Sequence, residues 1–139
     1  VLGEQGGALE KLIPIFKLYG GGPIGSGEQW MPWIHLDDVV GLFLHAIDHE
    51  AVRGPVNVVA PDPRRNRDLM QALGDALQRP SWLPVPAFAL KVALGEAAAV
   101  LLEGQRVVPG VARETGYAFR HPKLEEALAA VVRGEQAVA

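Results

Sequence analysis

Residues 30–49, WMPWIHLDDVVGLFLHAIDH, change from an extended pattern to a helical one within a few positions. Aromatic and branched side chains dominate residues 30–35, which is typical of a strand. From Asp38 onward apolar side chains recur at helical spacing, and Asp37 is of a residue type that caps helices. This stretch therefore predicts a strand followed by a helix over 38–49 that is capped by Asp37.

Helices and strands alternate along the rest of the chain, which favours an α/β fold. There are too few predicted strands for a complete doubly wound sheet. Asn66 is expected to cap the helix that follows it, and Pro122 is expected to begin the last one. The expected helices are 8–19, 66–78, 87–103 and 122–134, and the expected short strands are 1–3, 56–60 and 117–120.

Composition excludes several classes of function. The chain has 139 residues, a net charge of −3 and no cysteine. The lack of cysteine excludes disulfide frameworks and thiolate chemistry. The chain also lacks the excess of basic residues that is typical of nucleic-acid-binding proteins. The most apolar stretch, 87–102, contains Lys91 and Glu96 and is shorter than the ~20 residues that a membrane span needs. We expect a cytoplasmic protein that binds neither nucleic acid nor membrane.

Two motifs resemble known sites but have simpler explanations. Residues 20–25, GGGPIG, match G-x-G-x-x-G, yet they follow a predicted helix rather than a strand, so a turn is favoured over a phosphate site. His45 and His49 share one helical face, but no third ligand is evident and histidine also suits a helix C-terminus. We therefore assign no metal ligand from the sequence.

Polar and aromatic residues around position 35 suggest a site. His35 with Asp37 and Asp38 could act as an acid–base cluster, although capping aspartates and a hydrogen-bonded buried histidine explain them as well. Trp30 and Trp33 lie beside the glycine-rich loop, where aromatic residues line a ligand pocket or pack in a core about equally often. At odd spacing in a strand, the two tryptophans are expected to face opposite sides.

An ordered set of short motifs resembles a known family. The motifs are VLG, GGALEKLIP, GGPIGSGEQW, WIHLDDVV, GPVNVVAP and LPVPAFALK. Together they are similar to the C-terminal half of extended short-chain dehydrogenases/reductases (SDRs), in the NAD(P)-dependent epimerase/dehydratase-like branch that carries a DUF1731 domain. The resemblance implies the helix-rich substrate-side portion of a Rossmann-type protein, with a few short strands and with the nucleotide-binding part preceding it. It divides the chain into an SDR remainder (1–80), a DUF1731-like helical region (81–130) and a tail (131–139).

The resemblance also implies where the chemistry lies. The family's glycine-rich nucleotide loop and its Tyr-x-x-x-Lys pair precede the part seen here. Neither Tyr19 nor Tyr117 has a lysine four residues later. We therefore expect no catalytic residue in this chain, no activity of the chain alone, and NADP or NAD bound by the intact parent but not by this fragment.

The matching motifs assign binding roles to six residues. Leu2 and Gly3 would edge the nicotinamide pocket of the parent, and Trp30, Met31, Trp33 and His35 would shape the pocket for a small-molecule substrate. Sugar-nucleotide epimerases commonly place an arginine for the substrate phosphates where this chain has Met31. The resemblance therefore implies a less charged substrate than a nucleotide-diphosphate sugar.

Two further expectations concern partners. Some relatives carry a cell division inhibitor label, which implies the alternative that this is a non-catalytic binding or regulatory protein on an SDR scaffold. The fragment should also expose apolar surface where a cofactor domain would pack, so self-association into a homo-oligomer is expected.

Overall fold

Helices dominate the computed structural model, which describes residues 1–3, 5 and 7–138. In the described residues, extended segments pair only through isolated bridges, which join Leu2 to His35, Ile24 to Val85 and Trp30 to Arg65. The helices are α1 (Gly7–Lys17), α2 (Leu36–Asp48), α3 (Asn66–Leu77), α4 (Ala87–Leu94), the short 3-10 helix η1 (Gly95–Ala97), α5 (Ala98–Leu102), α6 (Gly110–Glu114) and α7 (Leu124–Val138).

The predicted strands are extended segments without a ladder. Residues 56–60 lie against the segment before α2, where the amide of Ala60 donates to the carbonyl of Trp33 at 2.8 Å. Residues 117–120 also form no regular strand. The prediction of regular strands was wrong here, because a strand needs a neighbour that continues alongside it and each segment meets only single partners.

Two helices begin with other caps than the sequence predicted. α2 begins at Leu36, and its N-cap is His35, whose Nδ1 accepts a hydrogen bond from the Asp37 amide. α3 begins at Asn66 itself, after Arg65, because the Asn66 side chain accepts from the Ile24 amide at 2.7 Å instead of capping its own helix. Asp37 and Asn66 are therefore not the caps that the sequence predicted.

The other differences lie in the last third of the chain. The single helix expected over 87–103 is broken at Gly95, whose φ of 58° is incompatible with an α-helix and favours glycine. α6 was not predicted. α7 begins two residues after Pro122 and continues beyond 134. The predicted boundary between residues 130 and 131 falls inside α7, and Ala139 of the predicted tail lies outside the described residues.

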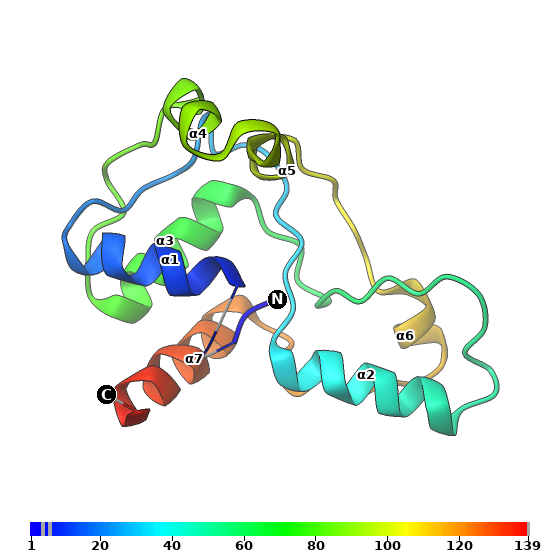
Figure 1. The fold of residues 1–139 in the computed structure, drawn as a ribbon. Helices are drawn as coiled ribbons and strands as arrows, with labels where there is room; N and C mark the ends of the chain where they lie inside the picture. Colours follow the sequence, from blue (N-terminus) through cyan, green and yellow to red (C-terminus); the bar gives the residue numbers. More distant parts are fainter. Residues whose placement is uncertain (4, 6, 139) are drawn as a thin grey trace.

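The main core lies between α1, α3 and α7. α3 packs against both of the other helices (Figure 1). Each helix presents an apolar stripe at helical spacing, which is why the predicted helices 8–19 and 66–78 formed close to their expected positions. The fully buried side chains of this core include Leu9, Phe16, Met70, Leu73, Leu124 and Leu128.

A second, smaller cluster joins α2 to α6. Ile34, Leu42 and Ala112 are buried there, with Tyr117 and Phe119 packed against them. In Figure 1, α2 and α6 lie to one side of the α1, α3 and α7 group. Within the described part of the chain, no helix has the length and apolar character required to cross a bilayer.

The glycine-rich loop at 20–27 forms a turn whose backbone pairs with the proline-rich segment at 80–86. The carbonyl of Gly21 accepts from the amides of Trp82 and Leu83, and the amide of Gly25 donates to the carbonyl of Val85. A Cβ at Gly22 would lie 2.2 Å from the Leu83 carbonyl oxygen, so glycine allows the two backbones to approach. These backbone groups are therefore used within the fold.

Candidate functional site

An apolar pocket of about 340 Å³ lies where α1 and α3 meet the segment that precedes α2. A pocket of this size falls at the small end of the range that takes small-molecule ligands. It is lined by Val1, Leu2, Ala8, Leu9, Lys11, Leu12, Ile15, Ile24, Met31, Pro32, Trp33, Leu69, Met70, Leu90 and Leu101.

Three of the six residues singled out from the sequence line this pocket: Leu2, Met31 and Trp33. Trp33 is almost fully buried, and its indole Nε1 donates to the carbonyl of Asp62 at 2.7 Å. This hydrogen bond fixes the ring, so that it forms a rigid wall of the pocket. Met31 adds a polarizable, adaptable side chain beside it.

The chemistry of the pocket is that of an apolar ligand site. Lys11 is the one residue with a charged side chain among those that line it, and this side chain is exposed. The walls supply the free energy of apolar burial, and the ammonium supplies one cation at the rim. The arrangement can therefore hold an apolar or aromatic group, with a single anionic or polar group near Lys11.

Trp30 lies outside this pocket. Its ring is flanked by two guanidinium groups, those of Arg65 at 4.7 Å and Arg106 at 5.6 Å from the ring centroid. Such cation–π contacts stabilise the connection between the segments that carry the two arginines. The two tryptophans face different surroundings, as expected: Trp33 lies in the hydrophobic core, and Trp30 is half-buried outside it.

Gly3 and His35 line a second, more open pocket of about 350 Å³ together with Gln5, Leu36 and Asp37. The amide of Leu2 donates to the carbonyl of Ile34, and the amide of Leu36 donates to the carbonyl of Leu2. This pairing holds the N-terminal segment beside the start of α2. The six residues are therefore divided between two pockets and the arginine-flanked Trp30.

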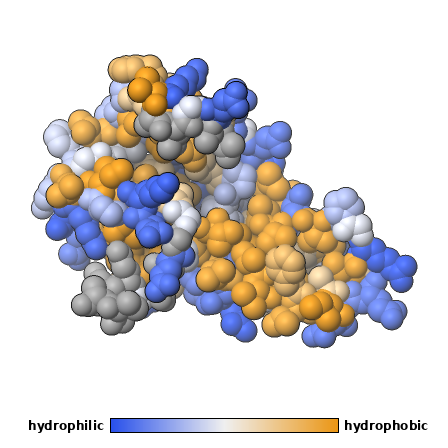
Figure 2. Space-filling view, in the orientation of Figure 1, coloured by the Kyte–Doolittle hydropathy of each residue, from blue (hydrophilic) through white to orange (hydrophobic). Residues whose placement is uncertain are grey.

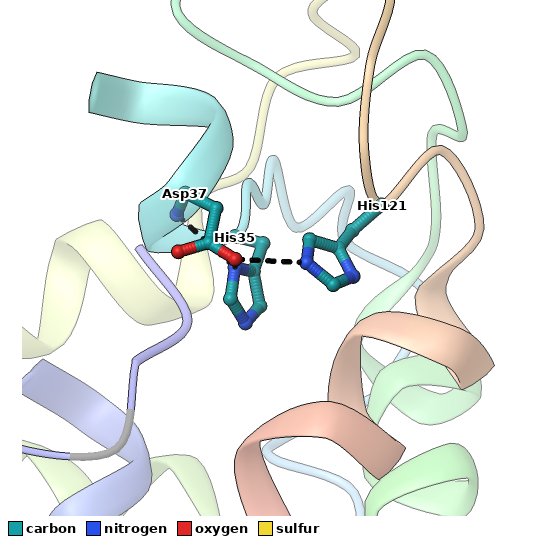
Figure 3. A group of neighbouring side chains, drawn as sticks. All are labelled: His35, Asp37 and His121. Atoms are coloured by element: carbon teal, nitrogen blue, oxygen red, sulfur yellow. Dashed lines mark hydrogen bonds and ion pairs between the residues drawn. The ribbon is translucent and has the colours of Figure 1, made fainter. Parts of the chain in front are cut away.

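His35 and Asp37 meet a residue that the sequence did not single out, His121 (Figure 3). The His121 Nε2 lies 3.1 Å from the Asp37 Oδ2, and the His35 Nδ1 lies 3.6 Å from the same oxygen. The two imidazole rings lie face to face at 3.9 Å between centroids, tilted by 35°. His121 is 84 residues from Asp37, so no local spacing could have indicated it.

Asp38, which the sequence offered as a helix cap or as part of an acid–base cluster, is fully buried and bonds instead to distant residues. Its carboxylate accepts hydrogen bonds from the Tyr117 hydroxyl at 2.9 Å and from the amides of Arg120 at 2.7 Å and His121 at 2.9 Å. Burial, then the hydrogen bond to Asp38, raises the pKa of Tyr117 to about 12. Asp38 thus holds the loop that carries His121 against α2.

The other histidine pair forms a structural arrangement. The rings of His45 and His49 stack at 3.9 Å, as their spacing on one helical face predicts. The His45 Nε2 lies 3.0 Å from the Thr115 hydroxyl, and the His49 Nδ1 lies 2.9 Å from the carbonyl of His45. In the described residues, the group that brings three candidate ligands together is instead His35, Asp37 and His121.

Known proteins resemble nearly the whole chain. A family model described as a domain of unknown function, DUF1731, matches residues 85–131. The epimerase family protein SDR39U1 homolog of Arabidopsis thaliana, described as chloroplastic, is 50% identical over 133 residues, which are 96% of this chain and 38% of that protein. The epimerase family protein YfhF of Bacillus subtilis is 38% identical over 99% of this chain and 45% of its own length. The chain spans less than half the length of these relatives.

Solved structures agree with these relatives. A crystal structure of human epimerase family protein SDR39U1 with NADPH matches with a TM-score of 0.91 and 40% identity, over 95% of this chain and 45% of that chain. A nucleoside-diphosphate sugar epimerase from Corynebacterium glutamicum matches with a TM-score of 0.66 and 25% identity, over 99% of this chain and 27% of that chain. The chain therefore matches the C-terminal part of an epimerase family protein of the extended SDR type.

Proposed function

We propose that this chain is the substrate side of an NADPH-dependent epimerase-family oxidoreductase and is inactive alone. The observation that carries the proposal is the likeness to a solved epimerase family structure that contains NADPH, of which the chain covers 45%. The apolar pocket beside Leu2 supplies a ligand site in the same part of the fold. A cytoplasmic location and a small-molecule substrate belong to the same proposal.

Leu2 and Gly3 are the residues of this chain that we propose to meet the cofactor. Gly3 borders the open pocket that also contains the Asp37 carboxylate. A carboxylate repels phosphate but accepts hydrogen bonds from an amide, so this edge suits the uncharged nicotinamide end of the cofactor. The bound cofactor supplies hydride chemistry, and the residues of this chain only shape the pocket beside it.

The substrate class follows from the apolar pocket. Met31, Trp33 and their neighbours offer no cation for a diphosphate, and Lys11 alone stands at the rim. Two phosphates need several charged donors to replace their hydration. We propose a largely apolar substrate with one polar or anionic group. This agrees with the expectation from the sequence, where Met31 replaces the arginine that binds substrate phosphates in sugar-nucleotide epimerases.

The test of the function uses the chain extended upstream into the longer protein. NADPH and NADH are titrated and followed by the change in nicotinamide fluorescence. Saturable NADPH binding is expected for the extended protein but not for residues 1–139 alone. An extended protein that binds neither nucleotide would contradict the proposal and would favour the alternative of a regulatory scaffold.

A separate test addresses the apolar pocket in the chain as it stands. The probe is 1-anilinonaphthalene-8-sulfonate, which joins an aromatic body to one anion. Met31→Glu places an anion in the wall and is expected to weaken probe binding about tenfold or more, because the carboxylate repels the sulfonate of the probe and a charge is costly in an apolar site. Leu83→Glu, at a half-exposed position outside the pocket, is the matched control. Equal weakening by both variants would contradict binding in this pocket.

An exposed apolar face lies on α2. Leu36, Val40, Phe43, Leu44 and Ile47 follow helical spacing on one face, and all are exposed. Figure 2 shows an apolar patch in the part of the molecule where Figure 1 places this helix. Because the relatives contain more than half their length outside the match, we propose that this face packs against the nucleotide-binding part of a longer protein. Copies of the isolated chain are expected to associate through it.

A further inference from the structure

We propose that His35, Asp37 and His121 form a zinc-binding site at the start of α2. Their ligating atoms all lie within 4.8 Å of one another. The three side chains converge from two places, the N-terminal end of α2 and the loop before α7 (Figure 3). The site borders the same open pocket as the proposed nicotinamide edge, and it is tested in the chain alone, without cofactor or substrate.

The distances suit a tetrahedral ion. Bonds of about 2.0–2.2 Å from zinc to nitrogen and oxygen place tetrahedral ligand atoms about 3.4 Å apart. The Asp37 Oδ2 lies 3.1 Å from the His121 Nε2 and 3.6 Å from the His35 Nδ1. Both separations fall within a few tenths of an ångström of that spacing. The two imidazole rings are stacked with a tilt of 35°, so binding also requires them to turn until both lone pairs point at the ion.

The donor set selects the metal. Two imidazoles and one carboxylate form a common three-ligand zinc set, whereas calcium and magnesium prefer oxygen ligands throughout. The N-terminal end of a helix disfavours a cation, but the Asp37 carboxylate is a direct ligand and the Asp38 carboxylate lies one residue away. The local charge therefore suits a divalent ion.

The framework holds two of the ligands in place before any ion binds. The Asp38 carboxylate accepts from the backbone amides of Arg120 and His121, which fixes the loop that carries the His121 ring. The pairing of the Leu2 backbone with residues 34 and 36 fixes the backbone on both sides of His35. Less conformational entropy is then lost when the ion binds.

The site also leaves room for a fourth ligand. His35 and Asp37 line the open pocket of about 350 Å³ that Gly3 and Gln5 border. Three protein ligands with an open position are the arrangement of zinc sites that keep a bound water. The pocket provides the access path for the ion and the space for that water.

Zinc would take the His35 Nδ1 lone pair that now accepts from the Asp37 amide. The Asp37 amide would then lose its hydrogen bond within the capped first turn. Its proton and nitrogen NMR signals should move on zinc addition, which reports on the site independently of affinity. A metal bound by His45 and His49 would leave this amide signal in place.

The experiment titrates zinc chloride into the metal-stripped chain at pH 7.5 by calorimetry, with cobalt(II) absorption as a geometric probe. One zinc per chain and the intense visible bands of tetrahedral cobalt are expected. His121→Ala and Asp37→Asn should each weaken zinc binding more than about tenfold, since even supporting groups around a metal contribute 10–100-fold. His49→Ala, in the other imidazole pair, should leave affinity unchanged.

Far-UV circular dichroism checks the fold of each variant. Asp37→Asn preserves the shape of a half-exposed side chain and decides the outcome if His121→Ala fails to fold. The absence of saturable zinc binding in the wild-type chain would overturn the proposal. So would unchanged affinity in a folded Asp37→Asn chain, or loss of binding in His49→Ala.

Discussion

The Tyr117 hydroxyl donates a hydrogen bond to the buried Asp38 carboxylate over 2.9 Å, across 79 residues of sequence. The same carboxylate accepts from the amides of Arg120 and His121. Asp38 thus connects α2 to the loop that leads into α7. The position of His121 beside Asp37 depends on this connection.

Replacing Asp38 by asparagine should destabilise the protein by about 2–3 kcal/mol. The asparagine amide is a donor, so it cannot accept from all three groups that now share the carboxylate, and a buried donor is left unsatisfied. Urea denaturation measures the free energy of unfolding.

Asp37→Asn is the matched control for this change, because Asp37 is half-exposed and its ion pairs are weak. It should cost less than about 1 kcal/mol. Equal losses for the two variants would contradict the role assigned to Asp38.

Tyr117 makes stability fall at high pH. The pKa of Tyr117 is raised from 10.0 to about 12 in the folded chain, so the folded state favours the protonated phenol. Its contribution is complete below pH 10 and is lost as the pH rises through 12, which amounts to about 3 kcal/mol over that window. The free energy of unfolding of wild type and Tyr117→Phe should be compared across this range.

At about pH 9 Tyr117→Phe should be less stable than wild type by about 1 kcal/mol, through the lost hydrogen bond. The difference should shrink or reverse above the folded pKa, because only the wild type then has to bury or protonate a phenolate. A difference that stays constant with pH would contradict the raised pKa.

Gly41→Ala should destabilise α2 although alanine is the better helix former. A helical glycine-to-alanine change ordinarily gains up to about 1 kcal/mol. Here the new Cβ would lie 2.1 Å from the Tyr117 hydroxyl oxygen, so the aromatic ring must move. We expect a net loss of about 1–3 kcal/mol by thermal or urea denaturation.

Two comparisons isolate this clash. In the Tyr117→Phe background the loss should be smaller, because the nearest remaining ring atom is 3.0 Å from the new Cβ. Gly110→Ala, where a Cβ would meet nothing within 4 Å, should not destabilise the protein. A stabilised Gly41→Ala variant would show that the ring does not occupy this position.

The apolar face of α2 should control the assembly of the isolated chain. Sedimentation velocity at tens of micromolar is expected to show a dimer or larger species. Phe43→Glu, at a position 63% exposed, should shift the chain to monomer because it places a charge in the buried interface. Leu18→Glu, at a position 83% exposed outside α2, serves as the control and should not. A monomeric wild-type chain would contradict the prediction.

Local sequence determined where the first long helices lie but did not determine their end residues. The apolar stripes of 8–19 and 66–78 predict α1 and α3 because helical hydrogen bonds and side-chain periodicity are both local. The caps depend on distant donors: Asn66 is used by the Ile24 amide, and His35 replaces Asp37 as the cap of α2. A capping residue type can therefore be read from sequence, whereas its hydrogen-bond partner cannot.

The candidate site was predicted in part for the same reason. The motif around residues 30–35 indicated Met31, Trp33 and His35, since aromatic and histidine residues in an extended segment are visible locally. That Trp33 enters the pocket while Trp30 stacks between arginines depends on Asp62, Arg65 and Arg106, which reach the segment only in the folded chain.

The sequence by itself determined the positions of α1, α2 and α3, the motif set that resembles the extended SDRs, and the absence of thiol chemistry. The tertiary structure alone decided which of two adjacent aspartates is buried and which faces His121. Asp37 and Asp38 have the same chemistry and nearly the same local context. They differ because the loop at 117–121 arrives from about 80 residues away and satisfies one carboxylate with buried donors, and burial of a charge is tolerated only where such donors exist.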